Sequence, residues 1–206
     1  MAAQVNSESL AQLTNFNLER LADLVQEAGM LSKTPRTGWP FLRAHSESVS
    51  EHLYRTTVIG FILARLAQAD AFKVVSLCLF HDLHEARTGD FNYVYHRYNT
   101  TKAREAVADA TSGSGLHEEI LALFDTFQAK DSLEALLAHD ADQLDLIANL
   151  TVALQDGHEF AREWLDAALP RLCTREGKIL AEAILRRDVK AWWYEQKPKE
   201  WWIHHQ

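Results

Sequence analysis

One stretch of the chain, residues 71–90 (AFKVVSLCLFHDLHEARTGD), places ionisable side chains at the end of an apolar run. His81 and Asp82 are adjacent, and Glu85 follows His81 by four residues, on the same face of a predicted helix. Asp90 comes shortly after, behind a glycine that offers a break. An imidazole and three carboxylates at the end of a buried helix are costly unless something pairs with them. A metal ion is the simplest partner for such a group.

Two residues on neighbouring predicted helices extend this pattern to H…HD…D. His52 lies in the first turn of a helix predicted over residues 48–66, and Asp142 lies within a long apolar helix over residues 132–154. Asp142 has apolar residues one turn away on either side, so we expect it to point inward, whereas Asp140 is expected to face water.

Two imidazoles and two carboxylates suit a borderline divalent ion such as Mn, Co, Fe, Ni or Zn. Such a ligand set leaves coordination positions open for water. A hydrolase needs an open position, because the ion lowers the pKa of bound water and polarises a phosphoryl oxygen. The pattern therefore favours metal-assisted hydrolysis.

The elements that must position these residues are helices, because apolar residues recur with helical spacing and no useful stretch alternates as a strand does. The predicted class is all-α, and a length of 206 residues favours one domain. The predicted helices cover residues 17–28, 48–66, 71 to the break at 89, 102–111, 116–127, 132–154, 159–172 and 176–187. In the second of these helices we expect burial of Val58, Ile59, Phe61, Ile62, Leu63 and Leu66.

Composition excludes several classes of partner. A net charge of −8 argues against a nucleic-acid polymer, which needs a basic face. No apolar stretch is long enough for a membrane span, and the N-terminal residues lack a signal-peptide pattern. Two cysteines form no disulfide framework, so we expect a cytoplasmic protein. The tryptophans near the C-terminus, which we expect in the core or in a homodimer contact, are Trp192, Trp193, Trp201 and Trp202.

Four ordered motifs resemble the HD-domain phosphohydrolases, and more narrowly their small single-domain branch, the 5′-deoxyribonucleotidase-like proteins. The motifs are PRTGW at 35–39, SVSEH at 48–52, HDLHEARTGD at 81–90 and DADQLD at 140–145. The resemblance implies a single HD-domain helical bundle over residues 1–206. Its motif core would span about 35–145, with the helices of residues 159–206 packed on it.

The same resemblance assigns roles to individual residues. One divalent ion would be held by His52, His81, Asp82 and Asp142. Glu85 and Asp90 would be the acid/base pair, with the two roles left open between them. Arg36 would hold the phosphate and Trp39 would border the sugar or base. Those two residues are adjacent in some members, whereas Thr37 and Gly38 stand between them here.

The expected reaction is release of phosphate from a (deoxy)nucleoside 5′-monophosphate by attack of metal-activated water. One metal and one arginine suffice for a single terminal phosphate, whereas a triphosphate must be matched by several cations. Three alternatives stay open. They are a triphosphohydrolase, a non-catalytic nucleotide sensor, and a dinuclear oxygenase or phosphodiesterase that would need further ligands such as His96 and His117.

Overall fold

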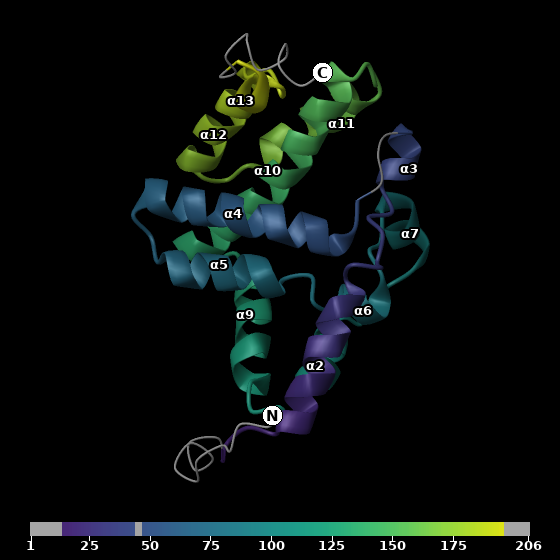
Figure 1. The fold of residues 1–206 in the computed structure, drawn as a ribbon, viewed down its shortest axis with the longest axis vertical. Coiled ribbons are helices and arrows are strands. Elements are labelled where there is room, and N and C mark those ends of the chain that lie inside the picture. Colours follow the sequence, from purple (N-terminus) through teal and green to yellow (C-terminus); the bar gives the residue numbers. More distant parts are fainter. Residues whose placement is uncertain (1–13, 44–46, 196–206) are drawn as a thin grey trace, which may run out of the picture.

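The computed structural model describes residues 14–43 and 47–195, and in this part of the chain it consists of helices joined by short connections (Figure 1). The predicted all-α class is confirmed, since the isolated bridge between Pro35 and Ser48 is the one β pairing among these residues. The helices are α2 (Leu18–Met30), α3 (Trp39–Leu42), α4 (Val49–Ala67), α5 (Ala71–Phe80), α6 (Glu85–Thr88), α7 (Tyr93–Tyr98), α8 (Ala103–Thr111), α9 (His117–Ala129), α10 (Leu133–Gln155), α11 (Ala161–Ala168), the 3-10 helix η1 (Leu169–Arg171), α12 (Arg175–Arg186) and α13 (Ala191–Tyr194).

Helix α10 is the central element, since it packs against α4, α5, α9, α11 and α12. In Figure 1, α4 and α5 lie side by side across the middle, and α11, α12 and α13 gather at the end marked C. Helices α2 and α9 extend toward the opposite end. None of the helices in the described part of the chain has both the length and the apolar character that a membrane span requires.

Local capping fixes where the two helices that carry histidines begin. Ser48 accepts a hydrogen bond from the backbone N–H of Glu51, and the Glu51 carboxylate accepts one from the backbone N–H of Ser48, which is the predicted capping box. Asp70 caps α5, as the sequence predicts, by accepting from two backbone N–H groups. Helix α5 then ends at Phe80, so Glu85 begins a separate short helix instead of continuing the helix that leads to His81.

The expected burial of the second half of α4 is only partly correct. Ile59 and Leu63 are buried, but the apolar residues on the other face are 40–55% exposed, namely Val58, Phe61, Ile62 and Leu66. Helices α5 and α10 pack on the face that carries His52, which leaves the opposite face to solvent. A helix that is apolar on most sides does not by itself reveal which side is covered.

The tryptophans near the C-terminus also depart from the expected core packing. Trp192 and Trp193 are 76% and 36% exposed. Trp201 and Trp202 lie outside the described residues. The homodimer contact that the sequence suggests for these residues stays a prediction.

Close approach of α4, α5 and α10 depends on the absence of a side chain at Gly60. A Cβ built there would lie 2.6 Å from the Sγ of Cys78, 3.3 Å from Val74 and 3.7 Å from Ala141. These neighbours belong to α5 and α10, the helices that carry the site residues. Gly60 therefore sets the spacing of the three helices.

We predict that Gly60→Ala lowers the free energy of unfolding. Overpacking costs about 1–3 kcal/mol, offset by about 1 kcal/mol of helix propensity, so a net loss of up to about 2 kcal/mol is expected in urea denaturation. Adding Cys78→Ala should restore part of the loss, because it removes the Sγ. Gly29→Ala in α2 is the matched control, since a Cβ there meets nothing within 4 Å. Equal stability of the two alanine variants would contradict the packing argument.

Candidate active site

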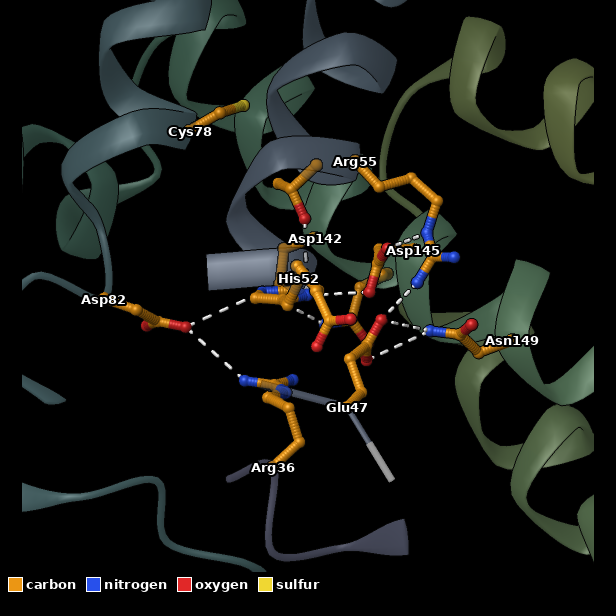
Figure 2. Close-up of polar contacts among 12 residues, drawn as sticks. Arg36, Glu47, His52, Arg55, Cys78, Asp82, Asp142, Asp145 and Asn149 are labelled. Atoms are coloured by element: carbon orange, nitrogen blue, oxygen red, sulfur yellow. Dashed lines mark hydrogen bonds and ion pairs between the residues drawn. The ribbon is translucent and has the colours of Figure 1, made fainter. Parts of the chain in front are cut away.

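Four predicted site residues from three helical segments lie near one another, and Figure 2 labels three of them, His52, Asp82 and Asp142. His52 comes from α4, His81 and Asp82 follow the end of α5, and Asp142 comes from α10. The Nε2 atom of His52 lies 3.3 Å from Oδ1 of Asp142 and 3.6 Å from Oδ2 of Asp82. The Nε2 atom of His81 lies 3.2 Å from the same Asp82 oxygen. Ligands about 2.1 Å from a shared ion stand about 3.0–3.4 Å apart, and these spacings are close to that range.

The two imidazoles are held so that their Nε2 atoms face the other candidate ligands. Nδ1 of His52 lies 2.7 Å from Oδ2 of Asp145, and Nδ1 of His81 lies 2.9 Å from the carbonyl oxygen of Cys78. Both Nε2 atoms are buried and have no hydrogen-bond partner among the described residues. Metal-bound histidines characteristically donate their other nitrogen in this way. His52, His81 and Asp142 offer ligand atoms that all lie within 4.8 Å of one another, so these three residues fit a divalent metal ion. Asp82 lies beside both histidines but is grouped with His84 and Glu85 instead of with Asp142.

The electrostatics of the metal-free centre keep its carboxylates charged. Burial alone would raise the pKa of Asp142, but the adjacent His52 imidazole and the charge of His81 hold it well below its usual range. Burial and the charge of Arg36 lower the pKa of His52, but the adjacent carboxylates of Asp142 and Asp145 raise it to about 10. A metal ion must displace this proton, so metal binding should strengthen as the pH rises.

Glu85 lies beside the centre in a buried position. It is 8% exposed, one of its carboxylate oxygens lies within 4.8 Å of one from Asp82, and its Oε2 atom has no hydrogen-bond partner in the described structure. Burial, followed by the charges of Asp82 and Asp90, raises the pKa of Glu85 to about 9, although Arg36 acts in the opposite direction. In the metal-free protein this carboxyl group therefore carries a proton at neutral pH.

The loop before α3 brings Arg36 and Asp90 together. The Nη1 atom of Arg36 lies 3.1 Å from Oδ1 of Asp90 and 3.5 Å from Oδ2 of Asp82. Thr37, one of the two residues inserted between Arg36 and Trp39, donates its backbone N–H to Oδ2 of Asp90 at 2.6 Å. Its hydroxyl donates to the carbonyl oxygen of Asp90 at 2.8 Å. Thr37 thus positions Asp90, a contact that the sequence did not predict.

A cavity of about 230 Å³ opens beside the centre. Its lining includes Arg36, Trp39, Asp90 and Asp142 together with residues of α7 and α11. Trp39 is 4% exposed, and its indole Nε1 donates to Oε2 of Glu47 at 3.2 Å, so its ring is a fixed part of the wall. The structure thus brings Trp39 and Arg36 to one cavity, as the sequence predicts.

Sequence reasoning missed a buried polar network behind His52 (Figure 2). Arg55 forms ion pairs with both Asp145 and Glu47, and Nδ2 of Asn149 lies 3.1 Å from Oε1 of Glu47. Glu47 also accepts from Trp39, so the network runs from His52 to the cavity wall. The spacing of Asp145, three residues after Asp142, was the one available signal.

The expectation that Asp140 faces water is wrong, because its side chain is fully buried. Its carboxylate accepts hydrogen bonds from the backbone N–H groups of Cys173 at 2.8 Å and Thr174 at 2.7 Å. The Thr174 hydroxyl donates to it as well, at 2.5 Å. Asp140 therefore attaches the start of α12 to α10, which is a structural role.

The two histidines considered for a second metal do not join the candidate ligands. His96 lines the cavity from α7, and Nδ1 of His117 lies 2.9 Å from the Thr111 hydroxyl oxygen. Neither is found in the groups of described residues that could hold a metal ion. The dinuclear alternative therefore gains no support from these residues.

Comparison with known proteins places this geometry in context. A family model described as HD domain matches residues 28–186. The protein named 5′-deoxynucleotidase HDDC2 from Danio rerio is 27% identical over 136 residues, which cover 63% of this chain and 68% of that protein. The Homo sapiens protein of the same name is 26% identical over 147 residues, covering 68% of this chain and 72% of that protein.

Solved structures share the fold. A conserved hypothetical protein from Pyrococcus furiosus has a TM-score of 0.68 and 27% identity, over 81% of this chain and 99% of that chain. The cyanophage S-2L HD phosphohydrolase DatZ, bound to dA and one catalytic Zn²⁺ ion, has a TM-score of 0.52 and 19% identity, over 79% of this chain and 96% of that chain. At 19% identity the likeness shows the fold alone.

The metal assignment predicts that Asp82→Ala loses the ion. Elemental analysis after loading with Mn²⁺, Co²⁺ or Zn²⁺ should find metal in the wild type and a large loss in the variant. The rise in Tm that metal gives the wild type should also shrink, because an ion that binds only the folded state stabilises it. Asp166→Ala, at an exposed position on α11, is the control. Unchanged metal content in Asp82→Ala would refute the assignment.

The raised pKa of Glu85 predicts a pH-dependent stability difference in the chelated, metal-free protein. The pKa is about 9 in the fold against 4.5 without it, so the folded state binds the proton more tightly. Wild type should therefore lose stability relative to Glu85→Gln as the pH rises from about 5 to about 9. Tm values of both proteins across this range test the trend. Glu119→Gln, at an exposed position, should show a constant difference.

Proposed function

The chain belongs to the HD domain family, and we propose that its site releases phosphate from nucleoside 5′-monophosphates, with deoxynucleotides preferred. It is a metal-dependent phosphohydrolase. One observation carries the proposal, namely the convergence of His52, His81, Asp82 and Asp142 with Arg36 beside them. The relatives named 5′-deoxynucleotidase support the choice of substrate.

The proposed metal site holds one divalent ion on those two histidines and two aspartates. When bound, the ion would polarise a phosphoryl oxygen and activate the attacking water. The Nη1 atom of Arg36, between Asp82 and Asp90, is placed to donate to the phosphate. Asp90 accepts from Thr37 and Arg36, and so orients the guanidinium toward the centre.

We assign the proton donor to Glu85. Its raised pKa keeps it protonated near neutral pH in the metal-free protein, and a buried acid is suited to protonating the 5′-oxygen as it leaves. Asp90 then serves as a positioning group for Arg36. Under this proposal Glu85 is the acid of the pair whose roles the sequence left open.

A monophosphate suits this site better than a triphosphate. Arg36 is the one arginine or lysine among the described residues that lies within 4 Å of a candidate ligand carboxylate. A triphosphate needs several such donors. Trp39, fixed by Glu47 in the cavity wall, would crowd a 2′-hydroxyl and so favour deoxyribose.

Two wider predictions accompany the proposal. Cys78 and Cys173 are both free thiols, which supports a cytoplasmic location. A homodimer remains the proposed assembly, and its test is the mass of the protein in solution.

The proposal predicts phosphate release from dAMP, with a higher kcat/KM than for AMP or dATP in the metal-loaded protein. Free phosphate and longer polyphosphates are followed separately. Glu85→Gln should keep metal and substrate while turnover falls about 10²–10⁴-fold, as for a lost general acid. Tripolyphosphate release from dATP that outpaces phosphate release from dAMP would refute the monophosphate assignment. Nucleotide binding without any release would indicate a sensor.

A further inference from the structure

The cavity beside the metal centre continues along α10 toward α11. A second cavity of about 280 Å³ is lined by Tyr93, Leu146, Glu163, Trp164, Ala167 and Arg171. Four of these residues, Tyr93, Leu146, Trp164 and Arg171, also line the first cavity. Leu146 lies one helical turn beyond Asp142 on α10. The two cavities therefore form one groove that starts at the metal centre and leads away from it.

The walls of the groove beyond the centre are aromatic. The rings of Tyr93 and Trp164 lie edge to face with centroids 6.3 Å apart. Trp164 approaches the backbone of Gly38, where a Cβ would lie 3.4 Å from its indole ring. Aromatic side chains of this kind stack on nucleobases, because every base has a π-face. This part of the groove thus suits a flat heterocycle.

Two charged side chains stand at this aromatic part of the groove. The guanidinium of Arg171 lies 5.5 Å from the centroid of the Tyr93 ring. Within the described structure, neither the Arg171 guanidinium nor the Glu163 carboxylate takes part in a hydrogen bond or ion pair. The groove therefore offers one uncommitted fork of donors and one uncommitted pair of acceptor oxygens.

A guanidinium and a carboxylate, as on Arg171 and Glu163, distinguish between nucleobases by the donors and acceptors on the base edges. Guanine presents two acceptors, O6 and N7, to a guanidinium fork, and its N1–H and N2 amino group are donors for a carboxylate. Adenine carries a donor amino group where guanine has O6, so it would face the guanidinium with the wrong polarity. Pyrimidines lack the N7 acceptor.

We propose that this groove is a nucleobase subsite that selects oxopurine nucleotides, with guanine preferred. Arg171 donates to O6 and N7, Glu163 accepts from N1–H and the 2-amino group, and the base stacks on one face of the Trp164 ring, which Tyr93 supports edge to face. The proposal rests on the nucleotidase activity proposed above, with the phosphate at Arg36 and the base at Arg171.

The test compares kcat/KM for dGMP, dIMP, dAMP and dCMP in the metal-loaded protein. The wild type should prefer dGMP over dAMP by about tenfold, the low end expected for a bidentate pair, because the subsite is partly open. Arg171→Met keeps an unbranched side chain, removes the guanidinium and should lower the dGMP-to-dAMP ratio about tenfold. dIMP lacks only the 2-amino group, so Glu163→Gln should affect dGMP more than dIMP.

Arg162→Met, at an exposed position next to Glu163 on α11, is the control and should leave the ratio unchanged. Equal use of dGMP and dAMP by the wild type would overturn the inference while leaving the nucleotidase proposal intact. An equal loss for all four substrates in Arg171→Met would also overturn it, because that pattern indicates a general electrostatic effect.

Calorimetric binding to Glu85→Gln gives a readout that does not depend on turnover. Tighter binding of dGMP than dAMP, lost on adding Arg171→Met, would support the subsite. If this preference appears while the wild type releases no phosphate from any nucleotide, the nucleotidase proposal fails and the base subsite stands. If the two nucleotides bind equally, the inference fails.

Discussion

Burial of ionisable groups at the junction of α4, α5 and α10 is the constraint on which the site depends. His52 is fully buried there, and Asp82 and Asp142 lie beside it in a largely enclosed position. Removing one partner of a buried ion pair typically costs about 3–5 kcal/mol, since the other charge is left uncompensated. The surrounding structure must therefore supply partners for every one of these groups, and Gly60 allows the helices close enough to do so.

The network behind His52 satisfies much of this requirement. Asp145 accepts from the histidine and pairs with Arg55, which in turn pairs with Glu47. Because Glu47 also binds the indole of Trp39, one connected set of hydrogen bonds orients a candidate metal ligand and a wall of the substrate cavity. Hydrogen-bond networks of this kind hold site side chains in the narrow range of positions and orientations that catalysis requires.

The Thr37–Gly38 pair between Arg36 and Trp39 has two structural consequences. Thr37 fixes the Asp90 carboxylate, and Gly38 leaves room for Trp164 to approach the loop. The loop thereby links the phosphate end of the groove to its aromatic end. The same two residues that separate Arg36 from Trp39 thus help to shape the cavity that both of them line.

The sequence by itself determined the all-α class and the starts of α4 and α5, because capping and apolar spacing act within a few residues of chain. It also nominated the residues that the structure brings to one centre. Only the tertiary structure decided which helix faces are covered. Phe61, expected to be buried, is exposed, and Asp140, expected to face water, is buried. Asp145, which accepts from His52, lies 93 residues away in the sequence, and Asn149, one of the partners of Glu47, lies 102 residues away. Such contacts leave no local pattern, since they depend on how whole helices pack against one another.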